Sequence, residues 1–326
     1  MENRLMTLHL NQELFKNAIE ACAQNVRMNA LYIEKDYWVS YILKAISQSQ
    51  YKDVAIFKGG TSLSKAYKLI ERFSEDIDLA VITHDLTSNQ IKTLIRKIEK
   101  AILDANFEEI EIAYITSKGS EFRKTVHQYP KLYQGDFGHA NENIILEINS
   151  FAKPHPYNLM EISSYVGEFL HQKAPLMVSE FAMEPFFIHV LDFRRTLCEK
   201  LSAIARASYE SDAKLLELKA KIRHLYDIYF LMQHLDIQDF IHQDAFIEMI
   251  KIVREDDQKQ FDTSTWSHVK LSETPIFLNT SNILDQLNHH YTTQFHDLVY
   301  AQTLPSINEI QKAINEVAAI LTKEEL

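Results

Sequence analysis

Glycine and cysteine are both scarce in this chain. Its 326 residues include only six glycines and two cysteines. Cys22 and Cys198 lie far apart, and neither has the neighbouring residues that a metal or redox motif requires. We therefore expect two reduced thiols in the core and no disulfide. In a chain so poor in glycine, the adjacent pair Gly59 and Gly60 stands out.

The chain also lacks an apolar run long enough to suggest a membrane span. Its first thirty residues carry Arg4, Glu13 and Arg27 within an amphipathic pattern, which fits neither a signal peptide nor an anchor. Hydrophobic residues make up 46% of the chain, enough to bury a substantial core. We expect a soluble cytoplasmic protein without a membrane partner.

Basic residues are also fewer than acidic ones. Asp and Glu total 45 against 34 Lys and Arg, so the formal net charge is −11. Such a chain does not favour nonspecific nucleic-acid binding, and a polyanionic partner would need a local basic patch. A solvated helical face and a patch of this kind explain the basic residues of one short region equally well. That region contains Arg194, Arg195, Lys200, Arg206, Lys214, Lys219, Lys221 and Arg223.

Hydrophobic periodicity divides the first half of the chain into helices and strands. Apolar residues at helical spacing predict helices over 10–26, 34–48 and 87–105, and the helical period also restarts just after Gly60. Short apolar or alternating runs predict strands over 54–57, 76–82, 109–115, 122–127 and 143–151. This half is expected to form a mixed sheet with flanking helices.

Helical periodicity dominates the second half. It predicts helices over 194–209, 213–235, 238–254, 281–291 and 305–323, with one further strand over 186–190. Pro154 and Pro156 make 152–160 the expected passage between two modules. We therefore predict an α+β fold, with a sheet domain over 1–155 and a mainly α-helical domain over 156–326.

Two short motifs in the first half suggest a nucleotide site. Gly59 and Gly60 follow an apolar strand and precede a helix, where the missing Cβ atoms would let backbone N–H groups approach a phosphate, with Thr61 or Ser62 as the helix cap. A tight turn explains a glycine pair as well. Residues two apart on a strand share a face, so a strand over 76–82 would project two carboxylates, Asp76 and Asp78, together. Carboxylate oxygens suit Mg²⁺, although acidic strand ends are commonly just solvated.

Together the motifs resemble the AbiEii/AbiGii toxin family (MenT-like) of the polymerase-β-type nucleotidyltransferase superfamily. The resemblance covers about residues 33–231, and its pieces occur in family order. They are Ile-Glu-Lys-Asp-Tyr-Trp at 33–38, Gly-Gly-Thr-Ser-Leu-Ser-Lys at 59–65, Arg-Phe-Ser-Glu-Asp-Ile-Asp at 72–78, Arg-Thr with Glu-Lys-Leu at 195–201, and Arg-His-Leu-Tyr-Asp-Ile-Tyr at 223–229.

The resemblance implies transfer of a nucleotide unit with pyrophosphate release, assisted by two Mg²⁺ ions. The implied nucleotide-binding set is Gly59, Gly60, Thr61, Ser62, Arg72, Ser74 and Lys200. The implied metal-binding set is Asp76, Asp78 and Glu147. Glu147 is the lone acid on an otherwise apolar strand, where it could also help to deprotonate the acceptor hydroxyl; an acid at a solvated strand edge is the alternative.

Two residues of the helical half complete the expected site. Lys200 is the candidate point charge for the β- and γ-phosphates, and an ordinary exposed helix lysine is the alternative. Asp227 lies among apolar residues, so we expect it to need a cationic partner, Lys200 or Arg223, and to orient Lys200. Arg72 either contacts phosphate or pairs with a neighbouring glutamate. The scattered histidines predict no structural zinc.

Three functional readings follow. The first is a nucleotidyltransferase that moves an NMP unit from an NTP to an acceptor, tRNA or another RNA, as the toxin of a toxin–antitoxin or phage-defence system with a possible cognate antitoxin. A protein acceptor is the alternative that the acidic charge favours. The second is a metal-dependent nuclease, against which the absence of an acid-x-lysine pair at Glu147 counts. The third is a nucleotide-binding module without catalysis.

Overall fold

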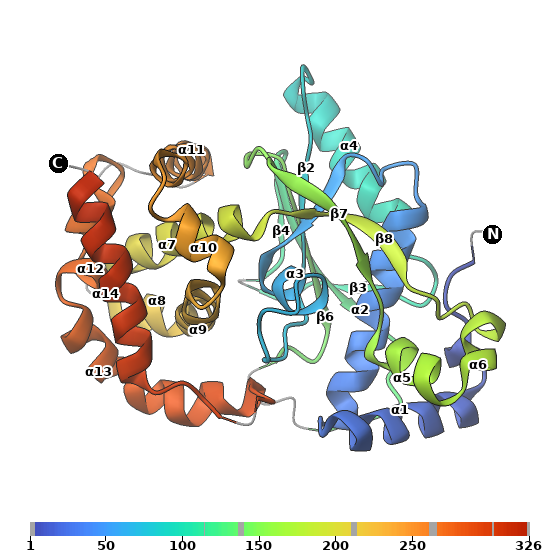
Figure 1. Ribbon diagram of the computed structural model, residues 1–326. Helices are drawn as coiled ribbons and strands as arrows, with labels where there is room; N and C mark the ends of the chain where they lie inside the picture. The colour runs from blue at the N-terminus through green and yellow to red at the C-terminus, as the bar shows by residue number, and fades with distance from the viewer. Residues whose placement is uncertain are drawn as a thin grey trace. The chain divides into compact units, whose positions relative to one another are not determined.

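The computed structural model describes residues 4–113, 115–135, 140–209, 214–260, 266–301 and 303–324. The fold is α+β, as predicted, with a mixed sheet and flanking helices (Figure 1). The chain forms two compact units. The first contains Met1–Lys68 and Phe73–Leu191, and the second contains Leu69–Arg72 and Asp192–Leu326.

An eight-stranded mixed sheet forms the centre of the first unit. The strand order is β3-β5-β6-β2-β1-β8-β7, and β4 pairs with β5. In the middle, β2 is antiparallel to β1 and parallel to β6, and β6 is antiparallel to β5. The strands are β1 (Ala55–Lys58), β2 (Ile77–Val81), β3 (Glu108–Ile110), β4 (Ser117–Lys118), β5 (Phe122–Gln128), β6 (Ile144–Asn149), β7 (Tyr157–Ile162) and β8 (Phe186–Leu191).

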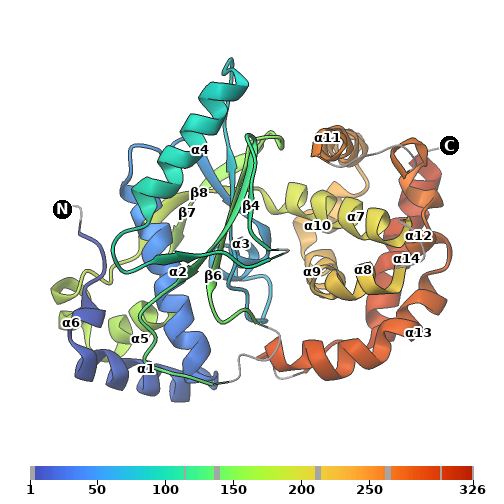
Figure 2. The same cartoon turned by 180° about the vertical axis from the view of Figure 1, so that it is seen from behind.

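Among the described residues, six α-helices accompany this sheet. They are α1 (Gln12–Val26), α2 (Ala30–Gln48), α3 (Gly59–Lys65), α4 (Ser88–Ile102), α5 (Tyr165–Lys173) and α6 (Pro175–Glu180). Helix α2 is the central one, because it contacts α1, α4, α5 and β8 (Figure 2). It begins where the Asn29 side chain accepts a hydrogen bond from the backbone N–H of Leu31, a typical N-cap. Its residues from Ile33 to Ile46 are all buried, charged ones included.

The second unit is helical. It contains α7 (Phe193–Tyr209), α8 (Lys214–Ala220), α9 (Ile222–Met232), α10 (Leu235–Phe240), α11 (Asp244–Gln260), α12 (Pro275–Leu278), α13 (Thr280–His290) and α14 (Ile307–Glu324). Helices α9 and α11 both pack against α7, and α14 packs against α9 and α13. The short segment Leu69–Arg72 joins this unit through a backbone bridge between Arg72 and Val299.

The division between the units differs from the one expected near residue 155. Residues 157–162 form β7, which pairs with β8 along its whole length and so belongs to the same sheet. The first unit therefore continues to Leu191. Pro154 and Pro156, which suggested a boundary between two modules, lie in the loop between β6 and β7. Proline is also common in such a loop, because it has no backbone N–H to continue a strand.

Three predicted elements also differ from those observed. The strand expected over 109–115 ends at Ile110, and residue 114 lies outside the described residues. The helix expected over 213–235 is two helices, α8 and α9, which meet at Lys221. The helix expected over 238–254 is α10 followed by α11. In both helical cases the apolar period continues across the break, so periodicity alone does not reveal it.

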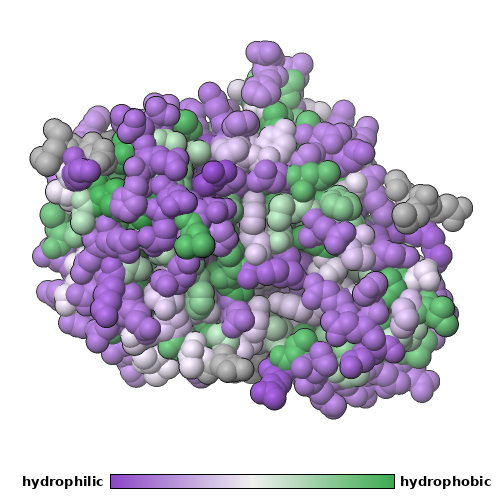
Figure 3. Space-filling view, viewed as in Figure 1, coloured by the Kyte–Doolittle hydropathy of each residue, from purple (hydrophilic) through white to green (hydrophobic). Residues whose placement is uncertain are grey.

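Both cysteines, Cys22 and Cys198, are buried and free, as expected. Within the described residues, no helix is long and apolar enough to cross a membrane. The face drawn in Figure 3 is mostly hydrophilic, and its apolar side chains lie in small separate groups.

Candidate active site

Four charged side chains stand next to one another across the middle of the sheet. The register pairs Lys58 of β1 with Asp78 of β2, Asp78 with Glu147 of β6, and Glu147 with Lys124 of β5. Directly paired residues on neighbouring strands point to the same face, so the four form one row, with two carboxylates between two lysines. We call it the charged row. Lys124 Nζ lies 3.6 Å from Glu147 Oε2.

The carboxylates of the charged row repel one another. Burial, the carboxylate of Glu147 and that of Asp76 together raise the pKa of Asp78 to about 8, and Lys58 and Lys124 offset only part of this effect. Asp76 directly precedes β2, so the strand begins one residue later than predicted.

Glu147 is not at a solvated strand edge. Strand β6 lies between β5 and β2 in the interior of the sheet, and the side chain of Glu147 is 24% exposed. The alternative reading of this residue as an edge acid is therefore wrong.

The donor set of the charged row suits a divalent cation. Carboxylate oxygens are the ligands that Mg²⁺ prefers, and a cation would relieve the repulsion that raises the pKa of Asp78. Within the described residues, however, no group of three or more His, Cys, Asp or Glu side chains is already gathered as a metal site. The predicted set of Asp76, Asp78 and Glu147 is thus a neighbouring group of acids rather than a preformed three-ligand cage.

The structure explains why position 59 requires glycine, which the sequence alone does not reveal. Gly59 has a φ of +81°, and a Cβ atom built there would lie 2.1 Å from Asp78 Oδ2. Any side chain at this position would therefore be strained and would collide with the central carboxylate of the charged row. Glycine is needed because backbone and carboxylate approach each other so closely.

The predicted cap of the following helix is wrong. Helix α3 begins at Gly59 itself and its N-cap is Lys58, so Thr61 and Ser62 lie inside the first turn. Both side chains are fully buried. Thr61 Oγ1 donates to the backbone carbonyl of Asp76 at 2.6 Å and lies 2.9 Å from Ser74 Oγ, whereas Ser62 Oγ donates to the carbonyl of Gly59 at 2.8 Å.

These bonds tie the start of α3 to the segment that leads into β2. The hydroxyls of Thr61, Ser62 and Ser74 are therefore engaged within the protein in this structure. Their contribution to a nucleotide site would come through the position of the backbone rather than through free hydroxyl groups.

Charged residues of α2 hold the surrounding loops. Asp36 is 5% exposed and forms a buried ion pair with Lys65, the last residue of α3. Its second oxygen accepts a hydrogen bond of 2.8 Å from the backbone N–H of Tyr165 at the start of α5. One carboxylate thus fixes two helices, one of which begins at Gly59.

The two preceding residues of α2 act in the same way. Glu34 accepts hydrogen bonds from the backbone N–H groups of residues 132 and 133. Lys35 donates to the backbone carbonyl of Asn141, and the backbone N–H of Asn141 donates to Glu75 at 3.0 Å. Glu75 lies directly before Asp76 in the chain, so this contact supports the segment that carries the metal-binding candidate.

A second cluster of charges lies in the helical unit. Arg72 donates from Nε and Nη2 to the two carboxylate oxygens of Asp227, both at 2.7 Å, and Lys200 Nζ lies 2.8 Å from Asp227 Oδ2. All three side chains are at least 95% buried. Burial raises the pKa of Asp227, but the two cations outweigh it and hold that pKa below its ordinary value.

The predicted partnership of Asp227 with Lys200 is confirmed, and the exposed-lysine reading of Lys200 is wrong. Arg72 forms an ion pair with Asp227, a partner that the sequence did not suggest. His224 also belongs to this cluster, although no sequence pattern pointed to it; its Nδ1 lies 3.4 Å from Lys200 Nζ. Burial, followed by the charge of Lys200, lowers the pKa of His224 well below its ordinary value, so His224 is neutral at neutral pH.

This cluster therefore combines two cations with one carboxylate and a neutral imidazole. Two buried cations next to each other form a region of positive potential. The prediction that Lys200 serves the same nucleotide as Asp76 and Asp78 joins residues of two units, and it stays a prediction.

The basic stretch between residues 194 and 223 is less available than its composition suggests. Arg194 pairs with Asp192 at 2.7 Å, and the buried Arg195 pairs with Asp256 at 2.7 Å. With Lys200 also in an ion pair, three of its cations have carboxylate partners within the helical unit. Proximity along the sequence is therefore a poor guide to a free basic patch here.

A family model agrees with the prediction of a nucleotidyltransferase. A family model described as nucleotidyl transferase AbiEii toxin, type IV toxin–antitoxin system, matches residues 41–323. A solved structure from H. pylori, described as a candidate nucleotidyltransferase, is 17% identical, covers 90% of this chain and 94% of its own, and has a TM-score of 0.45. JHP933 from Helicobacter pylori is 15% identical, covers 89% and 90%, and has a TM-score of 0.42.

With TM-scores below 0.5, neither structural likeness supports an inference by itself. No curated protein sequence matches the chain significantly. The family model, by contrast, spans well over half of the chain. The chain therefore belongs to the AbiEii family of nucleotidyl transferase toxins and is a nucleotidyltransferase.

Proposed function

We propose that the protein transfers an NMP unit from an NTP to a hydroxyl group of an acceptor, with release of pyrophosphate. The observation that carries this proposal is the pair of adjoining carboxylates, Asp78 and Glu147, on neighbouring strands of the charged row. Their mutual repulsion, which raises the pKa of Asp78 to about 8, is typical of carboxylates arranged to share a cation.

Mg²⁺ is the cation that fits this donor set. Asp76, Asp78 and Glu147 would hold it, most simply as two ions, and the bound metal would supply charge neutralisation at the α-phosphate and the leaving oxygen. The ammonium of Lys124 lies 3.6 Å from Glu147 and would help to hold that side chain in position. Glu147 is then suited to accept the proton of the attacking hydroxyl.

The turn at Gly59 would bring backbone N–H groups toward the triphosphate. The N–H groups at the start of a helix have no acceptor within it, and in α3 these include Gly59, Gly60 and Thr61, whereas Ser62 N–H makes the first intrahelical bond, to the carbonyl of the N-cap Lys58. Ser74, through its contact with Thr61, would hold this turn in place.

Lys200 would bind a phosphate group of the nucleotide, and Arg72 would strengthen the local positive potential. Asp227 contacts both and would orient them rather than take part in the chemistry. Because both cations are buried, water would screen their attraction for an incoming phosphate less than at an exposed site.

We propose RNA, and tRNA in particular, as the acceptor, because its terminal ribose offers the hydroxyl groups that the reaction needs. A protein hydroxyl is the second candidate, which the net charge of −11 favours. Each purified NTP, labelled at the α-phosphate, would be incubated with Mg²⁺, the protein and either total RNA or lysate protein. Label in RNA supports the proposal, label in protein assigns the second candidate, and no label in either polymer refutes nucleotidyl transfer.

As a toxin the protein would act in the cytoplasm, where NTPs and RNA are present, and a cognate antitoxin and a role in phage defence form part of the same proposal. Induced expression of the wild type should slow growth, and expression of Asp78→Asn to the same level should not. Equal growth inhibition by both proteins would contradict a toxicity that depends on the charged row.

A further inference from the structure

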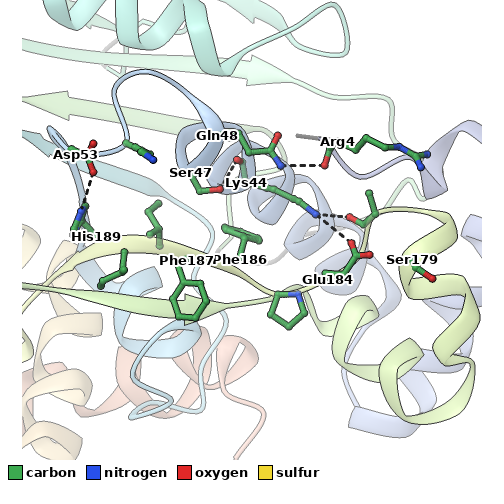
Figure 4. Close-up of a pocket in the computed structure, with 15 residues that line it drawn as sticks. Arg4, Lys44, Ser47, Gln48, Asp53, Ser179, Glu184, Phe186, Phe187 and His189 are labelled. Atoms are coloured by element: carbon green, nitrogen blue, oxygen red, sulfur yellow. Dashed lines mark hydrogen bonds and ion pairs between the residues drawn. The ribbon is translucent and has the colours of Figure 1, made fainter. Parts of the chain in front are cut away.

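A cavity of about 570 Å³ lies in the first unit, away from the charged row. It is formed by the C-terminal end of α2, the turn after it, the end of α6, and strands β7 and β8 (Figure 4). The charged row occupies β1, β2, β6 and β5 instead. No residue of the charged row lines the cavity.

The cavity contains a buried lysine. Lys44 is 5% exposed, and its Nζ donates to the backbone carbonyl of Ala182 at 2.6 Å. Glu184 Oε2 is the nearest described carboxylate, at 3.9 Å, which is too far for a hydrogen bond. An ammonium group has three donors, so Lys44 retains hydrogen-bonding capacity inside the cavity. Burial lowers the pKa of Lys44, and Glu184 offsets this only in part.

The carbonyl that receives Lys44 belongs to the residue that follows the end of α6. Ala182 has a φ of +52°, in the left-handed region. The next residue, Met183, donates its backbone N–H to the carbonyl of Val178 at 2.8 Å, the usual hydrogen bond of a helix C-terminal cap. The end of α6 therefore fixes the position of this carbonyl in the wall of the cavity.

Two further cations stand at the rim. Arg4 and Lys52 both line the cavity and are exposed. The two carboxylates that line it are Glu184 and Asp53, and Asp53 lies 3.4 Å from the imidazole of His189. With Lys44 buried, the cavity walls carry three cations against two anions, although the chain as a whole has a net charge of −11.

One wall of the cavity is apolar and open to solvent. Phe187 of β8 and Leu159 of β7 are 56% and 58% exposed, although large apolar side chains are usually buried. The register pairs Leu159 with His189, two residues beyond Phe187 on β8, so both apolar side chains project from the same face of this strand pair. An aromatic or aliphatic body can therefore rest against Phe187 and Leu159.

We propose that this cavity binds a small organic anion whose apolar body lies against Phe187 and Leu159 and whose carboxylate or phosphate head receives hydrogen bonds from Lys44. The rim cations Arg4 and Lys52 attract the anion. The site is separate from the nucleotide site and does not depend on nucleotidyl transfer.

The fluorescent probe 8-anilinonaphthalene-1-sulfonate tests this proposal, because it joins an aromatic body to an anionic head. N-phenyl-1-naphthylamine has a similar body without the charge and serves as the neutral probe. Titration of the wild type with the anionic probe should show one saturable site. Lys44→Met should weaken binding of the anionic probe about tenfold and leave binding of the neutral probe unchanged.

A second pair of variants keeps the test valid if Lys44→Met does not fold. Lys52→Gln removes an exposed rim charge and should weaken the anionic probe about threefold, whereas Lys97→Gln, an exposed lysine of α4 outside the cavity, should not. Phe187→Ser should weaken both probes, with Leu216→Ser as the matched change at an exposed apolar residue elsewhere. Unchanged affinity in both cavity lysine variants, or equal weakening of the neutral probe by them, would overturn the proposal.

Competition identifies the head group. Displacement of the anionic probe by 4-phenylbutyrate but not by phenyl phosphate assigns a carboxylate ligand, and the reverse result assigns a phosphate ligand. Failure of both compounds to displace the probe would also overturn the proposal.

Discussion

Replacement of Asp78 by asparagine should stabilise the protein at alkaline pH while it abolishes activity. Asparagine has nearly the same shape as aspartate, so it fits against Gly59, but it cannot ionise. The pKa of Asp78 rises from an ordinary value of 3.8 to about 8 on folding. Between these two values the folded state holds a proton that the unfolded state releases, so the stability of the wild type falls as the pH rises from about 4 to 8.

The size of the effect follows from the shift. One pKa unit corresponds to about 1.4 kcal/mol, so four units set an upper limit of about 6 kcal/mol for the cost of ionising Asp78 in the folded protein. Asp78 is partly exposed, and water and small movements of Glu147 reduce that cost. We expect a stability difference of about 2 kcal/mol above pH 8.5, which in a unit of this size raises the thermal midpoint by about 4–8 °C.

The assay is thermal unfolding of wild type and Asp78→Asn between pH 4 and 9 in EDTA. The difference between the two midpoints should be smallest near pH 4, should grow as the pH rises to about 8, and should level off above pH 8, where Asp78 is ionised in both the folded and the unfolded state. Because both proteins share every other titrating group, the difference isolates residue 78. Asp285→Asn, an exposed acid on α13, is the matched control and should show no such trend.

Mg²⁺ provides the second arm of the experiment. A cation held by Asp76, Asp78 and Glu147 would compensate the repulsion, so millimolar Mg²⁺ should raise the midpoint of the wild type at pH 8.5 more than that of the variant. A midpoint difference that is independent of pH would refute the electrostatic reasoning. An equal effect of Mg²⁺ on both proteins would refute the metal assignment.

Four further substitutions have defined outcomes. Gly59→Ala should lower the melting temperature and abolish transfer, because its Cβ would lie 2.1 Å from Asp78 Oδ2 in a backbone conformation that costs about 1–2 kcal/mol for alanine. Asp227→Ala leaves two buried cations without their carboxylate and should destabilise the protein by about 3–5 kcal/mol, whereas Lys200→Ala should raise the KM for NTP more than tenfold with a smaller loss of stability. Asp36→Ala leaves its buried lysine partner uncompensated and should cost a similar 3–5 kcal/mol in urea unfolding.

Three of these substitutions have a control or a contrary result. Gly135→Ala places a Cβ 3.2 Å from a flexible leucine methyl group and should be nearly neutral, so equal damage at both glycines would contradict the argument for Gly59. Loss of stability without a change in KM in Lys200→Ala would assign that lysine a purely structural role. Unfolding of Asp36→Ala at the same urea concentration as the wild type would show that the ion pair with Lys65 contributes no net stability.

Local sequence patterns predicted most elements because their signals are local. The strand at 55–58, the glycine turn and the helix at 88–102 each depend on residues within a few positions, so periodicity and turn chemistry locate them. The membership of β7 in the sheet was missed for the opposite reason. Its partner β8 lies about thirty residues away, and the intervening α5 and α6 carry no signal of that pairing.

The same distinction applies to the candidate site. The sequence brings Gly59, Asp76 and Asp78 to attention because they belong to one strand, turn and helix region. Lys58 and Lys124 escaped notice, since a lysine on a strand has no meaning until the register shows which residue lies beside it. The Thr61 and Ser62 hydroxyls were assigned to capping, and only the structure shows that they bond to residues of their own turn and of the next segment.

The sequence alone therefore determined the fold class, the family and the acids at 76, 78 and 147, because composition, periodicity and motif order are properties of the chain itself. Only the tertiary structure decided what surrounds those acids. Strand register set two carboxylates side by side between two lysines, and burial raised the pKa of Asp78. Helix packing gave Asp227 two cationic partners instead of one. Electrostatic energy depends on the distances between charges and on the exclusion of water, and both are set only when the chain folds.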